Sequence, residues 1–234
     1  MLAKVELAVT KVYREIYFMQ SDSLRWYFAK ESELLSELIA CLLGSQVHFD
    51  VALAVTRKIK ESGLLEMYDH LCMSSYESAI NAILKQPIHQ PGCPQKISRY
   101  RFPNTKANYI ARTLRSIYSN GKSLKGYLQS NVSSFEARRL IIKLATGIGP
   151  KQASLYLRNI GFTDDLAILD THVLKFMHLC EMINCYKKSI SSIKTYEIIE
   201  SELRKYAQQY DWRLGSLDLA IWIVMRVYTM ETKK

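Results

Sequence analysis

The chain has 234 residues, of which 48% are hydrophobic, so it can bury a substantial core in one or two domains. Its formal net charge of +10 is uneven, because residues 85–151 carry a net +12 whereas residues 1–84 carry −3 and residues 152–234 carry +1. A localised basic block favours a polyanionic partner, and a basic surface without a partner is the alternative.

The cysteine pattern argues against a disulfide-stabilised protein and against a zinc-binding protein. They are odd in number and lack Cys-x-x-Cys spacing, which supports neither a disulfide framework nor a zinc site: Cys41, Cys72, Cys93, Cys180 and Cys185. No signal peptide stands out, and no run of about 18 apolar residues could span a membrane. We therefore expect an intracellular protein that does not interact with membranes.

Hydrophobic side chains recur at helical spacing along almost the whole chain. Helices are predicted over residues 33–44, 51–59, 104–118, 124–128, 135–145, 150–161, 171–180, 192–209 and 216–230, with one or two more in 64–84. Residues 86–103 hold four of the five prolines and are predicted to form a loop. Because no series of strands is apparent, the predicted fold class is all-α.

Several residues mark the starts of these helices. The candidate N-caps are Ser133 or Ser134, Asp170, and Asn104 or Thr105 for the helix that ends near residue 118. Pro150 suits the first position of its helix, where a missing N–H group leaves no hydrogen bond unmade.

A Gly147-Ile148-Gly149 turn joins two of the predicted helices. The glycines allow unusual backbone angles and a close approach of a phosphate to the main chain. Ile148 is expected to point inward and hold the turn against the core. Backbone N–H groups at the following helix N-terminus would then bind a nucleic-acid phosphate. The motif by itself is weak evidence, since many helix turns contain glycine.

Lys151 and Asp170, nineteen residues apart, are the candidate catalytic pair. Lys151 lies in the first turn of its helix, where the macrodipole disfavours a positive charge and favours a neutral, nucleophilic amine. Such an amine could attack the anomeric carbon of a deoxyribose, displace a damaged base and form a Schiff base. Asp170 would stabilise the positive charge on the sugar. The structural alternatives are a surface lysine and an aspartate that only caps its helix.

Three segments carry a family resemblance: Thr146–Ser154, Leu157–Gly161 and Ala167–Asp170. They resemble the helix-hairpin-helix DNA glycosylase superfamily, and the whole chain most resembles its second, archaeal-type class of 8-oxoguanine DNA glycosylase/AP lyases. Lysine at position 151 implies a bifunctional enzyme that removes the base and cleaves the strand. The chain lacks the four-cysteine iron–sulfur motif of a sibling branch.

The resemblance also implies an architecture and partners. It implies two helical lobes with the helix-hairpin-helix at the DNA-binding cleft, one formed by residues 34–163 and the other by residues 1–33 with 164–234. The expected partner is damaged double-stranded DNA, and we expect a monomer without cofactor, metal or iron–sulfur cluster.

Further site residues follow from the same resemblance and from the requirement that a flipped base be stacked and hydrogen-bonded. Phe102 and Trp222 would sandwich the base, Asp218 would accept a hydrogen bond from its edge, and Lys234 would help to distinguish 8-oxoguanine from guanine. Gln46 would face the lesion or the opposite strand. DNA contacts are also expected from Gly147, Gly149 and His172. Core packing is the alternative for both aromatic residues.

Two other functions remain open from sequence. The same fold and mechanism could act on another oxidised base, or the hairpin could serve a non-catalytic DNA-binding module. The pairing of Lys151 with Asp170 argues against this non-catalytic module, because a hairpin that only binds phosphate needs neither residue. A metal-dependent nuclease would need a compact cluster of carboxylates and histidines, and the sequence shows none.

Overall fold

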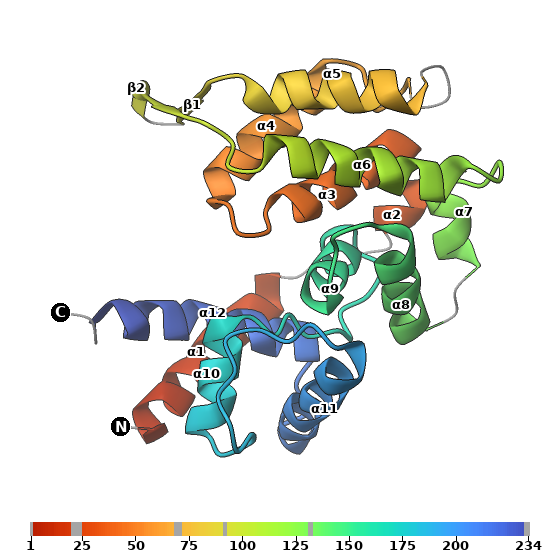
Figure 1. Ribbon diagram of the computed structural model, residues 1–234. Helices are drawn as coiled ribbons and strands as arrows, with labels where there is room; N and C mark the ends of the chain where they lie inside the picture. The colour runs from red at the N-terminus through yellow and green to blue at the C-terminus, as the bar shows by residue number, and fades with distance from the viewer. Residues whose placement is uncertain (1, 20–24, 68–71, 91–92, 131–132, 232–234) are drawn as a thin grey trace. The chain divides into compact units, whose positions relative to one another are not determined.

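The computed structural model describes residues 2–19, 25–67, 72–90, 93–130 and 133–231 and confirms the all-α prediction (Figure 1). Its helices are α1 (Leu2–Met19), α2 (Arg25–Phe28), α3 (Glu31–Leu43), α4 (Phe49–Glu61), α5 (Met73–Lys85), α6 (Pro103–Tyr118), α7 (Leu124–Gln129), α8 (Ser134–Leu144), α9 (Pro150–Asn159), α10 (Thr171–Leu179), α11 (Ile193–Gln209) and α12 (Leu214–Glu231). No described helix is both long and apolar enough to cross a bilayer.

The chain divides into two compact units. Unit 1 contains Met1–Leu24 and Gly149–Lys234, and unit 2 contains Arg25–Ile148. These boundaries differ from the expected ones at residues 33/34 and 163/164. Helix α9 groups with unit 1, in which its Arg158 side chain bonds to α12. Residues 25–33 group with unit 2, where the Glu31 carboxylate accepts the first backbone N–H groups of α7.

Unit 2 is built around α3. This helix carries apolar residues at steps of three and four, which gives it one continuous buried face. Its fully or almost fully buried side chains are Leu34, Leu35, Leu38, Ile39, Cys41, Leu42 and Leu43. Helices α4, α6 and α7 pack around α3, and α5 lies along α6. The core of this unit is therefore the one that the helical periodicity predicts.

A short β-hairpin replaces part of the predicted loop at 86–103. Strand β1 (Ile88–Gln90) pairs antiparallel with β2 (Cys93–Ser98), with Ile88 opposite Ser98. The prolines that suggested a loop are compatible with such a two-stranded ribbon, because each strand has a free edge where a missing N–H leaves no bond unmade. The loop prediction was wrong for these residues.

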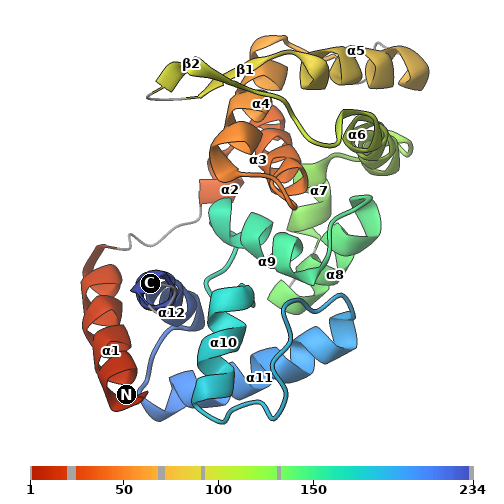
Figure 2. The same ribbon diagram turned by 60° about the vertical axis from the view of Figure 1, so that its left-hand side comes forward.

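In unit 1, helices α1 and α10 pack against α12. Figure 2 looks along α12, with α1 beside it. Val5, Val9 and Tyr13 of α1 join one buried cluster with Leu217 and Ile221 of α12. The ends of the chain thus build a common core, in which the Tyr13 ring also stacks on Trp212 at a centroid distance of 4.5 Å.

Two of the predicted helix caps are confirmed and one is wrong. The Ser133 side chain accepts the Glu136 N–H, and the Asp170 side chain accepts two N–H groups at the start of α10. Helix α6 begins earlier than expected, with Phe102 in the N-cap position and Pro103 in the first turn. The fixed φ angle of proline favours this earlier start over a cap at Asn104 or Thr105.

Candidate active site

The two glycines of the hairpin turn have different structural roles. Gly147 adopts a φ of +81°, and a Cβ atom there would lie 2.3 Å from Cδ2 of Tyr109. Gly149, the N-cap of α9, has an ordinary extended backbone with φ −100° and ψ −179°. Ile148 is 5% exposed, as predicted. The expectation of unusual backbone angles therefore holds for Gly147 and is wrong for Gly149.

Alanine substitutions should separate these two glycines. Gly147→Ala is expected to lower the free energy of unfolding by at least about 1–2 kcal/mol, the cost of the left-handed conformation for an L-residue. The clash with the Tyr109 ring adds to this cost. Gly149→Ala is the comparison and should lower the free energy of unfolding by less than about 1 kcal/mol, because only the N-cap preference for glycine over alanine is lost. Thermal melting of the variants tests this difference, and equal melting temperatures would contradict it.

Lys151 is the second residue of α9 and is partly exposed. Within the described part of the chain, its ammonium group has neither a hydrogen-bond partner nor an ion-pair partner. The side chain is therefore available to an incoming substrate, because no described carboxylate pairs with it.

Asp170 caps α10 with one carboxylate oxygen. Its Oδ1 accepts the N–H groups of His172 and Val173, both at 2.9 Å. No described residue donates a hydrogen bond to Oδ2. Capping thus uses only half of this carboxylate and leaves the other oxygen for a developing positive charge. The structural and chemical roles of Asp170 are compatible.

Side chains of α11 hold the segment before Asp170. The Glu200 carboxylate accepts the Ala167 N–H at 2.8 Å. The Tyr196 hydroxyl donates to the Ala167 carbonyl at 2.8 Å and accepts the Leu169 N–H at 2.9 Å. Tyr196 and Glu200 are at most 1% exposed. The backbone leading to Asp170 is therefore fixed by buried groups of α11, which no local sequence pattern indicates.

Asp218 occupies a position different from the one expected. Its carboxylate is 3% exposed and is bound by the Arg158 guanidinium at 2.5 Å and by the Ile168 N–H at 2.5 Å. Burial raises the pKa of Asp218 to about 6, although Arg158 and the Ile168 N–H act to lower it. Both of its oxygens are thus engaged inside unit 1, and the predicted contact with a base edge would compete with these bonds.

His172 and Trp222 are brought together in unit 1. Their rings meet edge to face with centroids 6.5 Å apart, and the Arg226 guanidinium lies 5.0 Å from the Trp222 ring centroid. Both side chains are half-buried. Trp222 therefore is not a fully buried core residue and keeps part of its surface accessible.

Gln46 and Phe102 belong to unit 2, Gln46 in the segment between α3 and α4 and Phe102 at the start of α6. Gln46 follows α3 with a φ of +62°, and Phe102 is the N-cap of α6. The C-terminal carbonyls of α3 are bound by two buried groups, the Tyr100 hydroxyl on Leu43 at 2.7 Å and the Lys106 ammonium on Leu42 at 2.8 Å. Burial also lowers the pKa of Lys106.

Lys234 lies outside the described residues. Among the described residues, no group of three or more histidine, cysteine, aspartate or glutamate side chains could hold a metal ion.

Residues 22–212 match the family model described as 8-oxoguanine DNA glycosylase. An 8-oxoguanine DNA glycosylase/AP lyase of Metallosphaera sedula is 38% identical over 140 residues, which are 60% of this chain and 65% of that protein. The Sulfurisphaera tokodaii protein of the same name is 32% identical over 83% of this chain and 82% of its own.

Among solved structures, the 8-oxoguanine DNA glycosylase of Thermotoga maritima superposes with a TM-score of 0.63 at 26% identity, covering 94% of this chain and 93% of that chain. The Methanocaldococcus jannaschii enzyme gives 0.62 at 25% identity, with 92% and 87% covered. The chain belongs to the 8-oxoguanine DNA glycosylase family.

Proposed function

We propose that this protein is a bifunctional DNA glycosylase/AP lyase that excises 8-oxoguanine, with Lys151 as the nucleophile. The observation that carries the proposal is the free amine of Lys151 at the start of α9, in the same unit as a carboxylate oxygen of Asp170 that no described residue binds. The similarity to two 8-oxoguanine DNA glycosylase/AP lyases supports both the glycosylase and the lyase activity. The Methanocaldococcus jannaschii structure contains a 15mer DNA with 8-oxoguanine, which supports DNA as the substrate.

Base excision begins with attack of the Lys151 amine on C1′ of the damaged nucleotide. The bond from C1′ to the base nitrogen breaks, and its electron pair leaves with the base, which then takes up a proton. Positive charge develops on the sugar as this bond breaks. The free oxygen of Asp170 stabilises that charge and accepts the proton that the amine loses.

Strand cleavage uses the same covalent bond. The sugar ring opens as the C1′–O4′ bond breaks, which leaves an imine between C1′ and Lys151. Loss of a proton from C2′ then lets the C3′–O3′ bond break, and the 3′ phosphate departs by β-elimination. Hydrolysis of the imine releases the sugar remnant and restores the amine.

The other predicted site residues complete this proposal. Backbone groups at Gly147 and Gly149 contact phosphate, with His172 and Gln46 as further DNA contacts. Phe102 and Trp222 stack on the flipped base. Oxidation gives guanine an N7–H donor, which Lys234 helps to distinguish from the acceptor of guanine. The protein acts as an intracellular monomer.

Borohydride trapping tests both the mechanism and the lesion. The protein is incubated with three duplexes that contain 8-oxoguanine, an oxidised pyrimidine or no damage. We expect a covalent adduct on the 8-oxoguanine duplex only, because borohydride reduces the imine to a stable amine. An adduct on the oxidised-pyrimidine duplex instead would identify that lesion as the substrate and keep the mechanism. Tight binding to all three duplexes without any adduct would favour a non-catalytic DNA-binding module.

A further inference from the structure

The Arg158–Asp218 ion pair joins three segments of unit 1. Arg158 lies near the C-terminal end of α9, the helix that carries Lys151 in its first turn. Asp218 belongs to α12, and its second partner, Ile168, lies two residues before Asp170. The side chains of the pair are only 10% and 3% exposed. Neither candidate catalytic residue takes part in this pair, but Lys151 lies on the helix of Arg158 and Asp170 lies two residues after Ile168.

A continuous path of hydrogen bonds runs from α9 to the backbone of Asp170. Arg158 Nη1 donates to both Asp218 oxygens at 2.5 Å, and its Nη2 donates to the Gly215 carbonyl at 2.7 Å. Asp218 Oδ2 also accepts the Ile168 N–H at 2.5 Å. The Ile168 carbonyl in turn accepts the Asp170 N–H at 2.8 Å. Every link is a direct contact within one unit.

The start of α12 is shaped to allow this arrangement. A Cβ atom at Gly215 would lie 2.8 Å from the Asp164 carbonyl oxygen and 3.1 Å from Arg158 Nε. The Gly215 N–H also donates to the same Asp164 carbonyl at 3.0 Å. Only glycine permits this close packing of helix, loop and guanidinium.

We infer that Arg158 and Asp218 are positioning residues that fix the Asp170 carboxylate relative to the Lys151 amine. The inference rests on the proposed function of that pair. Arg158 reaches from the helix of Lys151, and Asp218 holds the backbone two residues before Asp170. The ion pair thereby sets the geometry in which one group attacks C1′ and the other stabilises the sugar. Its polar groups are bonded to one another and to the backbone of unit 1.

The expected effect is on rate and not on affinity. A displacement of about 1 Å in a reacting group can cost a hundredfold in rate. DNA binding depends mainly on many phosphate contacts, to which a buried ion pair contributes little. Loss of the pair should therefore slow base excision while leaving the affinity for the lesion duplex nearly unchanged.

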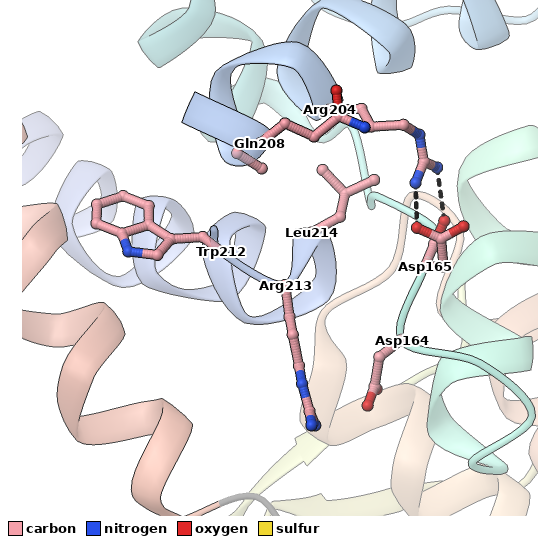
Figure 3. Close-up of a pocket in the computed structure, with 8 residues that line it drawn as sticks. Asp164, Asp165, Arg204, Gln208, Trp212, Arg213 and Leu214 are labelled. Carbon is pink, nitrogen blue, oxygen red and sulfur yellow. Dashed lines mark hydrogen bonds and ion pairs between the residues drawn. The ribbon is translucent and has the colours of Figure 1, made fainter. Parts of the chain in front are cut away.

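The first experiment compares Asp218→Asn with the wild type in single-turnover excision on the 8-oxoguanine duplex. We expect the rate to fall about 10- to 100-fold and the dissociation constant to change by less than about threefold. The matched control is Asp165→Asn, which removes the ion pair between Arg204 and the 58%-exposed Asp165, also in unit 1 (Figure 3). The control should retain the wild-type rate, because exposed ion pairs contribute little.

A double-mutant cycle distinguishes positioning from a general structural role. If the pair acts through Asp170, adding Asp218→Asn to Asp170→Asn should lower the rate by less than about threefold, since the group to be positioned is already disabled. Full additivity of the two changes would overturn the inference.

Folding of each variant is checked by thermal melting. If Asp218→Asn melts below the assay temperature, Arg158→Lys carries the same test, because it keeps the charge but loses the paired contacts.

The outcomes separate this inference from the proposed function. A wild-type protein that neither excises nor forms an adduct on any lesion would overturn the proposed function. An active wild type with Asp218→Asn at the same excision rate would overturn only the positioning role. A change in the dissociation constant alone would also overturn it.

Discussion

Lys151→Gln should abolish the borohydride adduct and strand cleavage on the 8-oxoguanine duplex. We expect the excision rate to fall by at least about a thousandfold, the scale on which loss of a covalent nucleophile acts. Affinity for the duplex should stay within about threefold, because one charge among many phosphate contacts is removed. Since Lys151 bonds to no described residue, its replacement leaves no partner unsatisfied. Gel analysis of adduct and cleaved strand measures both activities.

Lys205→Gln is the matched control for this experiment. Lys205 is an exposed lysine of unit 1 that pairs with Glu202 on the same helix. Its replacement removes the same charge as Lys151→Gln, but at a residue that has no role in the proposed mechanism. The control should give wild-type amounts of adduct. An adduct that persists in Lys151→Gln would show that another amine is the nucleophile.

Asp170→Asn should lower the excision rate about 100- to 10,000-fold, in the range expected for loss of a group that moves protons and stabilises charge. Asparagine is as good an N-cap as aspartate, so its side-chain oxygen can still accept the His172 and Val173 N–H groups. The melting temperature should therefore change little. Single-turnover excision and thermal melting on the same preparation separate activity from stability.

Asp170→Ala provides the comparison that isolates the cap. This variant should lose a similar factor in rate and, in addition, about 1 kcal/mol of stability, because two N–H groups of α10 lose their acceptor. Full excision activity in Asp170→Asn would show that the carboxylate serves only as a helix cap.

Local patterns made much of the fold and part of the site predictable. The apolar period of α3, the proline at the start of α9 and the caps at Ser133 and Asp170 each act within one or two helical turns. Such signals are legible in a single sequence because the interacting residues are neighbours along the chain. Gly147 was recognised for the same reason, since a left-handed turn requires glycine at that position.

Contacts between distant residues could not be predicted in this way. Arg158 and Asp218 are 60 positions apart, and nothing near either residue indicates its partner. The family resemblance predicts a base contact for Asp218, whereas the structure shows both of its oxygens bonded inside unit 1. The Tyr109 ring that excludes a Cβ at Gly147 was missed because it comes from a different helix. The β-hairpin was missed because three prolines in and around it outweighed the short strand pattern.

The order of the units along the chain has a consequence for folding during synthesis. Unit 2 is one uninterrupted stretch, whereas unit 1 combines the two ends of the chain. The Tyr13 hydroxyl accepts the Arg213 N–H across 200 positions, and α1 packs mainly on α12, so α1 completes its packing only after the last described helix has been made. Because chains emerge from the N-terminus and distant contacts close late, unit 2 can form first. The half that carries Lys151 and Asp170 therefore matures last, and a truncated chain would retain a folded unit 2 without the proposed chemistry.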